Sequence, residues 1–222
     1  MRDLKLSLSR TSLTNYLSKQ LQFFYPDGYS LNEKVLDYSV SLAVDRLRIC
    51  FDPIVSKYYV NGNSSIFNHL NGDQYAMFLY FVSNNAYLAG DENLASKIFL
   101  LNKAMFGLDA FYSIKLPEHF LLVHPLGSIL GNAEYGDYLV VYQGVTIGST
   151  NNGNYPTFGE STILYSNTSI LGNCITGKNF VLAANSSLIN TRIEDNKVVL
   201  GNYPQNKIIN NSNNLISNYF RS

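Results

Sequence analysis

Two cysteines, three histidines and few charged residues limit what this chain of 222 residues can be. Cys50 and Cys174 lie far apart, with no CxxC or Cys/His cluster around them, so the sequence supports neither a disulfide scaffold nor a zinc site. Lys plus Arg and Asp plus Glu number 16 each, so no net charge attracts nucleic acid or anionic lipid. We therefore expect no metal and no nucleic-acid partner.

Long apolar runs are also missing. No run reaches the length of a membrane-spanning helix, and the N-terminal segment MRDLKLSLSRTSL lacks the hydrophobic region of a signal peptide. The apolar content of 46% is that of an ordinary globular protein, and the length is sufficient to bury a core. We therefore expect a cytoplasmic protein without a membrane span.

Residues 11–107 carry apolar residues at helical spacing, with turn signals near residues 26, 71 and 90. Ser30 with Glu33 is a capping-box pattern at the start of the second segment. Asp73 is expected to be the N-cap of the third segment, and Gly107 to close the fourth. The pattern predicts a subdomain of four or five helices over residues 1–108.

After residue 117 the period changes to six residues. Aliphatic or aromatic residues recur at Ile129, Tyr135, Val141 and Ile147 and, after a break over residues 149–157, at Phe158, Leu164 and Ile170. This step fits neither a helix nor an alternating strand, but it is the step of a triangular parallel β-helix. The pattern weakens at Thr176 and Glu194, where an aliphatic residue is expected. A β-sandwich with short strands is the alternative, although its turn signals would recur every eight to twelve residues or so.

The histidines differ in their surroundings. His69 lies in a polar, loop-like stretch and His119 lies just before the coils, and we interpret both as structural. His124 opens a run with Gly127 and Gly131 at the point where the coil pattern starts. Its context makes His124 the candidate catalytic residue.

The stretch over residues 108–208 resembles serine acetyltransferase and its relatives among the hexapeptide-repeat acyltransferases. The family landmarks are an H-x-x-G-x-x-x-G run (here 124–131), a V-T-[LI]-G run (145–148), a looped-out segment (149–157), an I-L-G-N run (170–173) and a V-x-G-N-P-like run (199–204). In the family an aspartate fifteen residues before the histidine orients its ring, and here that residue is Asp109.

The resemblance implies an α+β fold: an N-terminal all-α helical subdomain followed by a C-terminal left-handed parallel β-helix. The expected boundaries are residues 1–108 for the helical subdomain, 109–210 for the β-helix and 211–222 for a C-terminal tail. It also implies a homotrimer, with pairing of two trimers through the helical half as an open alternative.

The implied activity is direct transfer of an acetyl group from acetyl-CoA to a hydroxyl acceptor. His124 would act as the general base, since a histidine titrates near neutrality, and Asp109 would fix its tautomer. A backbone N–H near Gly148 is the family-based donor to the oxyanion.

The family binds the CoA arm in the groove between two β-helices of the trimer. Its two small-residue contact positions fall on Ser166 and Ala184, because close approach of the pantetheine requires small side chains there. Lys207 is a further candidate, for contact with a CoA phosphate.

Departures from the serine enzyme concern the acceptor. Val123 replaces an aspartate that holds the serine ammonium, and Asn154-Tyr155-Pro156 replaces an Arg-His-Pro run that holds its carboxylate. Each lost charge-assisted hydrogen bond costs roughly 1.5–3 kcal/mol, so the sequence disfavours free serine. Neutral Asn154 and Tyr155 suit a polyhydroxyl acceptor.

We therefore favour a glycan acceptor, a sugar or surface-polysaccharide hydroxyl. A serine O-acetyltransferase of cysteine biosynthesis with a divergent acceptor pocket is the alternative. A non-enzymic β-helix, or a trimeric zinc hydratase of the same fold, is a third hypothesis. The hydratase needs three histidine ligands at a subunit interface, whereas only His119 and His124 lie in or near the coils.

Overall fold

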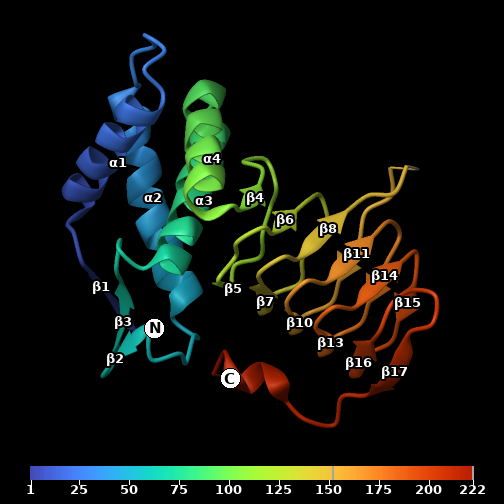
Figure 1. The fold of residues 1–222 in the computed structure, drawn as a ribbon. Helices are drawn as coiled ribbons and strands as arrows, with labels where there is room; N and C mark the ends of the chain where they lie inside the picture. Colours follow the sequence, from blue (N-terminus) through green and yellow to red (C-terminus); the bar gives the residue numbers. More distant parts are fainter. Residues whose placement is uncertain (152, 222) are drawn as a thin grey trace.

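The structure is a computed structural model and describes residues 1–151 and 153–221. A bundle of helices lies at one end of a parallel β-helix, and the chain passes from the first to the second once (Figure 1). The α+β class with a C-terminal β-helix is therefore confirmed. The helices are α1 (Arg10–Phe24), α2 (Glu33–Phe51), α3 (Gly72–Leu88) and α4 (Glu92–Phe106).

Two of the predicted helix caps are each wrong by two residues. The cap of α2 is Asn32 instead of Ser30, and its side chain accepts a hydrogen bond from the Val35 N–H at 3.3 Å. The cap of α3 is Asn71 instead of Asp73. Asparagine caps a helix as well as serine or aspartate does, and in both helices the asparagine lies two residues from the predicted cap. Gly107 ends α4 in the left-handed conformation, as predicted.

The helical half also contains a small sheet that the sequence did not indicate. Its strands are β1 (Asp3–Leu6), β2 (Val60–Asn61) and β3 (Ser64–Phe67), in the order β1-β3-β2. These strands have two to four residues, too few to show a period of their own. They lie beyond the lower ends of the helices in Figure 1.

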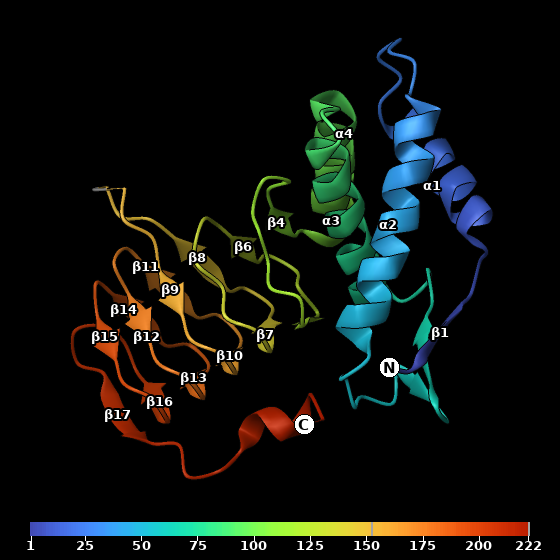
Figure 2. The same ribbon diagram turned by 180° about the vertical axis from the view of Figure 1, so that it is seen from behind.

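Among the described residues, fourteen strands form the β-helix, including its antiparallel end strand. They are β4 (Asp109–Ala110), β5 (Phe120–Val123), β6 (Ile129–Leu130), β7 (Leu139–Tyr142), β8 (Thr146–Gly148), β9 (Thr157–Phe158), β10 (Thr162–Leu164), β11 (Ser169–Leu171), β12 (Ile175–Thr176), β13 (Phe180–Leu182), β14 (Ser187–Ile189), β15 (Arg192–Ile193), β16 (Lys197–Leu200) and β17 (Lys207–Asn210). Three sheets form its faces, in the orders β17-β16-β13-β10-β7-β5, β14-β11-β8-β6-β4 and β15-β12-β9. The reverse view in Figure 2 shows β9, β12 and β15 stacked on one face.

Columns of inward side chains fill the β-helix, and each column runs along one sheet. The first column contains Leu122, Val141, Leu164, Leu182 and Val199, which pair in register and are all buried. The second contains Leu130, Ile147, Ile170 and Leu188, also buried. The six-residue step of the sequence is the interval between columns.

Two expected inward positions are wrong, because the interval changes there. Ile129 is 46% exposed and its neighbour Leu130 points inward, since eight residues separate Leu122 from Leu130. At the other end Ile193 is buried in place of Glu194, since five residues separate it from Leu188. The interval between inward residues is thus longer than the regular six-residue step in the first coil and shorter than it in the last coil.

Glycine and asparagine shape the corners of the later coils. A Cβ on Gly159 would lie 2.4 Å from the carbonyl oxygen of Gly177, and only glycine fits this close approach. Asn167 and Asn185 adopt φ values of 57° and 58°, and the Asn167 side-chain amide donates to the Asn185 side-chain oxygen at 3.2 Å. Asparagine tolerates this left-handed backbone better than most residues do.

The C-terminal segment returns to the helical half. β17 runs antiparallel to β16, and the 3₁₀ helix η1 (Leu215–Asn218) then leads back toward α2 (Figure 1). The Val55 N–H donates to the Tyr219 carbonyl at 2.9 Å, and Arg221 pairs with Asp52 at 2.8 Å. The tail therefore connects the two halves. Within residues 1–151 and 153–221, no helix combines the length and apolar character that a bilayer crossing requires.

Candidate active site

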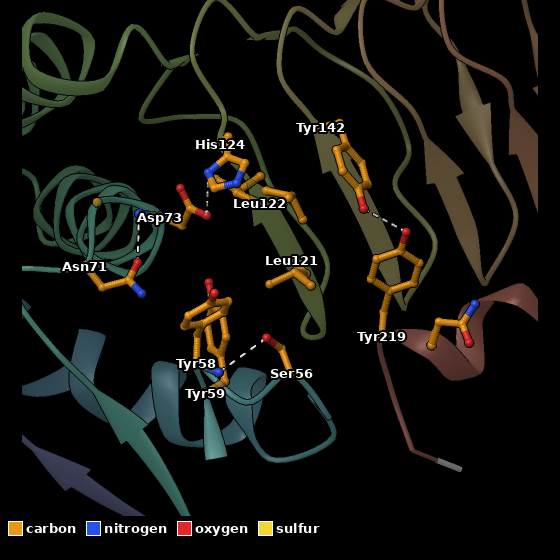
Figure 3. A pocket seen from close by; sticks show the side chains of 13 residues that line it. Ser56, Tyr58, Tyr59, Asn71, Asp73, Leu121, Leu122, His124, Tyr142 and Tyr219 are labelled. Carbon is orange, nitrogen blue, oxygen red and sulfur yellow. Dashed lines mark hydrogen bonds and ion pairs between the residues drawn. The ribbon is translucent and has the colours of Figure 1, made fainter. Parts of the chain in front are cut away.

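A cavity of about 460 Å³ lies where the helical half meets the first coils. Its wall comes from separate segments: Ser56, Tyr58 and Tyr59, residues 71–73 at the start of α3, residues 121–124, Tyr142 and residues 218–219. Figure 3 shows their side chains converging on one space. Such pockets between two packed units are common ligand sites.

His124 stands at the edge of this cavity because the first coil is extended. The additional residues of that coil lie between the end of β5 and the next corner, and they carry His124 outward. Its side chain is 79% exposed and its φ is 48°, a conformation that costs energy for a residue other than glycine. Pro125 is buried directly after it and fixes the turn. The ring is thus presented to the cavity by the backbone.

Asp73 is the carboxylate nearest to His124. Its Oδ2 lies 3.5 Å from the His124 Nδ1, and its side chain is 22% exposed (Figure 3). Asn71 caps α3 by accepting hydrogen bonds from the Asp73 and Gln74 N–H groups at 3.1 and 3.3 Å. The Asp73 carboxylate is therefore not used as the cap, and it faces the cavity.

The expected contact between Asp109 and His124 is not formed among the residues that the structure describes. The Asp109 carboxylate instead pairs with the Lys103 Nζ at 2.7 Å. Asp109 lies on β4, whose sheet is a different face of the β-helix from that of β5. The ring-orienting role of Asp109 remains a prediction from the resemblance, and the carboxylate beside the ring within one chain is Asp73.

The predicted CoA positions share one corner of the β-helix. Ser166 and Ala184 lie one coil apart, in a column that begins at Leu126, two residues after His124. Ser166 is half-buried and Ala184 is exposed. The two small residues therefore lie at one corner of the β-helix, in the column that starts near His124.

The other predicted residues lie at different places. Gly148 ends β8 on the adjacent face, and Lys207 is exposed on β17. Val123 lines the cavity, whereas Asn154 and Tyr155 are exposed in the loop between β8 and β9 and are not among the residues around the cavity. Within one chain, the structure does not bring the proposed polyhydroxyl contacts to His124.

Tyrosines close the cavity opposite Asp73. The Tyr142 and Tyr219 hydroxyls lie 2.8 Å apart, and the Tyr219 hydroxyl also donates to the Tyr165 hydroxyl at 3.4 Å. Burial, together with these hydrogen bonds, raises the pKa of Tyr219. Neither Tyr219 nor Asp73 was identified from the sequence, because no local motif connects the tail or the start of α3 with His124.

The remaining histidines and the cysteines have structural surroundings. The His119 Nδ1 lies 2.9 Å from Asp137, and the His69 Nδ1 lies 2.8 Å from the Ser7 hydroxyl. Burial raises the pKa of Cys50 to about 12 and also raises that of Cys174, which argues against a nucleophilic thiolate. In the described part of the chain, His, Cys, Asp and Glu form no cluster of three that could hold a metal ion.

Comparison with known proteins identifies similar chains, although no protein-family model matches this one. Serine acetyltransferase 2 of Arabidopsis thaliana is 31% identical over 186 residues, which cover 82% of this chain and 54% of that protein. The resemblance seen in the sequence is confirmed. The chain is serine acetyltransferase-like. It spans about half the length of the curated relatives it matches.

Solved structures share the fold. The Neisseria gonorrhoeae serine acetyltransferase in complex with serine has a TM-score of 0.67 at 19% identity and covers 91% of this chain and 84% of that chain. The Brucella abortus serine acetyltransferase in complex with coenzyme A has a TM-score of 0.66 at 15% identity and covers 92% and 83%. At these identities the comparison supports the helical half and the β-helix as one shared architecture.

Proposed function

We propose that this protein is an acetyl-CoA-dependent O-acetyltransferase and that its acceptor is L-serine. The observation that carries the proposal is the position of His124 on the wall of a cavity between the two halves, in a chain whose relatives are serine acetyltransferases. The relatives do not support the sugar or surface-polysaccharide acceptor favoured from the sequence. The structure weakens the argument for it, because Asn154 and Tyr155 lie outside the cavity.

The reaction requires one base and one oxyanion donor. His124 accepts the proton of the serine hydroxyl as its oxygen attacks the thioester carbonyl carbon. The new C–O bond forms, the C–S bond breaks, and the imidazolium returns its proton to the departing thiolate. Asp109 remains the ring-orienting residue that the resemblance implies, and the Gly148 N–H remains the candidate oxyanion donor.

We also propose that the active form is a homotrimer. Ser166 and Ala184 line an accessible corner, and the coenzyme A arm would run along it with a second β-helix as the other wall. Lys207 would meet a phosphate at the distal end. Cyclic closure of three prisms is a common arrangement, and analytical ultracentrifugation of the intact chain would test it.

A coenzyme A release assay tests the activity. The acceptors are L-serine, homoserine, simple sugars and nucleotide-sugars, and we expect turnover with L-serine. His124→Ala should lower the rate by about two to four decades, the usual contribution of a general base. His69→Ala is the matched control, since the half-buried His69 contacts Ser7 and is not among the residues that line the cavity. Faster acetylation of a sugar, or a His124→Ala rate within a few-fold of wild type, would contradict the proposal.

A further inference from the structure

The charges around the cavity are unbalanced. Among the described residues that line it, Asp73 is the only carboxylate, and the lining contains neither Lys nor Arg. Among the described residues, the side chain paired with Asp73 is the exposed His124 ring, whose Nδ1 lies 3.5 Å from the Asp73 Oδ2. This separation exceeds that of a good N–H···O bond, so both carboxylate oxygens remain available to a ligand.

A helix-stabilising role does not account for Asp73 at this position. An acidic residue in the first turn stabilises a helix, but Asn71 already caps α3 and the Asp73 side chain faces the cavity (Figure 3). A partly buried carboxylate is stabilised when a cation binds to it, and the distant His124 ring leaves room for one beside Asp73. The group that fits is an ammonium, which donates up to three hydrogen bonds.

We infer that Asp73 binds the ammonium group of the amino-acid acceptor and thereby places its hydroxyl at His124. The inference rests on the proposed function and deepens it. The amino and hydroxyl groups of serine lie on adjacent carbons, so an ammonium held by Asp73 keeps the hydroxyl near the ring. The sequence argument against serine was the neutral Val123 directly before His124. In this chain the negative charge comes from α3 instead.

A second role for Asp73 predicts a different result. A carboxylate that only orients the His124 ring would affect every acceptor alike and would act on kcat. A carboxylate that binds the ammonium would affect KM, and only for acceptors that carry an amine. Glyceric acid, in which a hydroxyl replaces the ammonium of serine, separates the two roles.

The kinetic test compares Asp73→Asn with wild type on L-serine and on glyceric acid. We expect kcat/KM for serine to fall on the order of 10–100-fold, the weight of one charge-assisted hydrogen bond, with the loss mainly in KM and little change for glyceric acid. Asp73→Glu should recover part of the loss. Glu92→Gln is the matched control, because Glu92 is the exposed first-turn acid of α4 and lies outside the cavity. Equal losses on both acceptors would overturn the inference.

A binding measurement separates this inference from the activity. The NMR signals of the His124 ring are followed while ethanolamine or L-serine is added without acetyl-CoA. We expect shifts in wild type and Glu92→Gln that are lost in Asp73→Asn. Shifts without any turnover of serine would refute the proposed function and leave the Asp73 site standing. Wild-type protein that binds neither amine would overturn the Asp73 site.

Discussion

The first coil of the β-helix and the later coils follow different rules. In the later coils six residues is the usual interval between inward columns, corners are held by Asn167 and Asn185, and Gly159 permits close stacking. In the first coil the interval from Leu122 to Leu130 is longer, and it carries the exposed His124. The regular coils supply the scaffold, and the irregular coil meets the helices and presents His124.

The difference indicates that separate residues of the same repeat determine the stability of the fold and the activity of the site. A residue inside a regular coil contacts the coils above and below, so its replacement affects folding. A residue in the extended first coil contacts the cavity, so its replacement affects binding or turnover. Each prediction below tests one side of this comparison.

The largest effect is expected at His124. His124→Gly should lower acetyl transfer by about two to four decades, as for loss of any general base. It should leave the unfolding free energy unchanged or raise it by up to about 1 kcal/mol, since glycine adopts a φ of 48° without strain. Chemical denaturation and the coenzyme A release assay measure the two quantities. A clear loss of stability would show that the first coil is also part of the scaffold.

A regular coil should respond in the opposite way. Gly159→Ala places a Cβ 2.4 Å from the Gly177 carbonyl oxygen, a backbone atom that cannot move alone, so we expect a loss of about 3 kcal/mol. Gly148→Ala is the control for stability, since its Cβ would meet only the Leu171 side chain at 3.7 Å within the chain. Thermal unfolding compares them. Equal melting temperatures for Gly159→Ala and wild type would contradict the stacking argument.

The tail should show a moderate effect that depends on pH. Tyr219→Phe removes hydrogen bonds to Tyr142 and Tyr165, at a cost of about 0.5–1.5 kcal/mol. The pKa of Tyr219 is raised by folding, so its contribution is complete below the unfolded value near pH 10 and is lost as pH rises beyond it. The difference between wild type and Tyr219→Phe should therefore shrink above about pH 10.

A denaturation series from pH 7 to about pH 11 measures this change. Tyr38→Phe, which alters an exposed tyrosine of α2, should show no difference at either end of the range. If the difference in unfolding free energy between wild type and Tyr219→Phe grew with pH, the stabilising role of the Tyr219 hydroxyl would be contradicted.

The smallest effect is expected at an inward threonine. Thr176 is buried in a regular coil, and its hydroxyl has no hydrogen-bond partner among the residues that the structure describes. Thr176→Val keeps the shape and removes the buried polar atom, so we expect a gain of about 1 kcal/mol. Thr162→Val is the matched control and should lose stability, because the Thr162 hydroxyl donates to the Gly159 carbonyl at 3.0 Å. Calorimetry can show whether the two substitutions change the unfolding free energy in opposite directions.

The sequence predicted the parts of the fold that repeat. The helical spacing indicated the helices, and the six-residue step indicated the coils. The six-residue step also placed Val141, Ile147 and Leu164 inside the β-helix. It failed at Ile129 and Glu194, because a fixed step cannot show where a residue is gained or lost. The strands β2 and β3, which lie between α2 and α3, have two and four residues and are too short to carry a period.

The candidate site was predictable only in part. His124 lies in a local motif, so the sequence indicates it directly. Asp73 and Tyr219 reach the cavity from α3 and from the tail, and no spacing in one dimension reveals that tertiary contact. Asp109 shows the opposite limit of sequence reasoning. Its spacing suggested a contact with His124, but nothing in the sequence indicated that its carboxylate pairs with Lys103.

The antiparallel strand β17 has a consequence for self-association. A parallel β-helix ends with unpaired N–H and C=O groups, and another molecule could add a further coil there. β17 covers the edge of β16 on one face, so an incoming parallel coil cannot stack directly on β16 there. The strand thus acts as a terminator that keeps an open-ended repeat from growing into fibres.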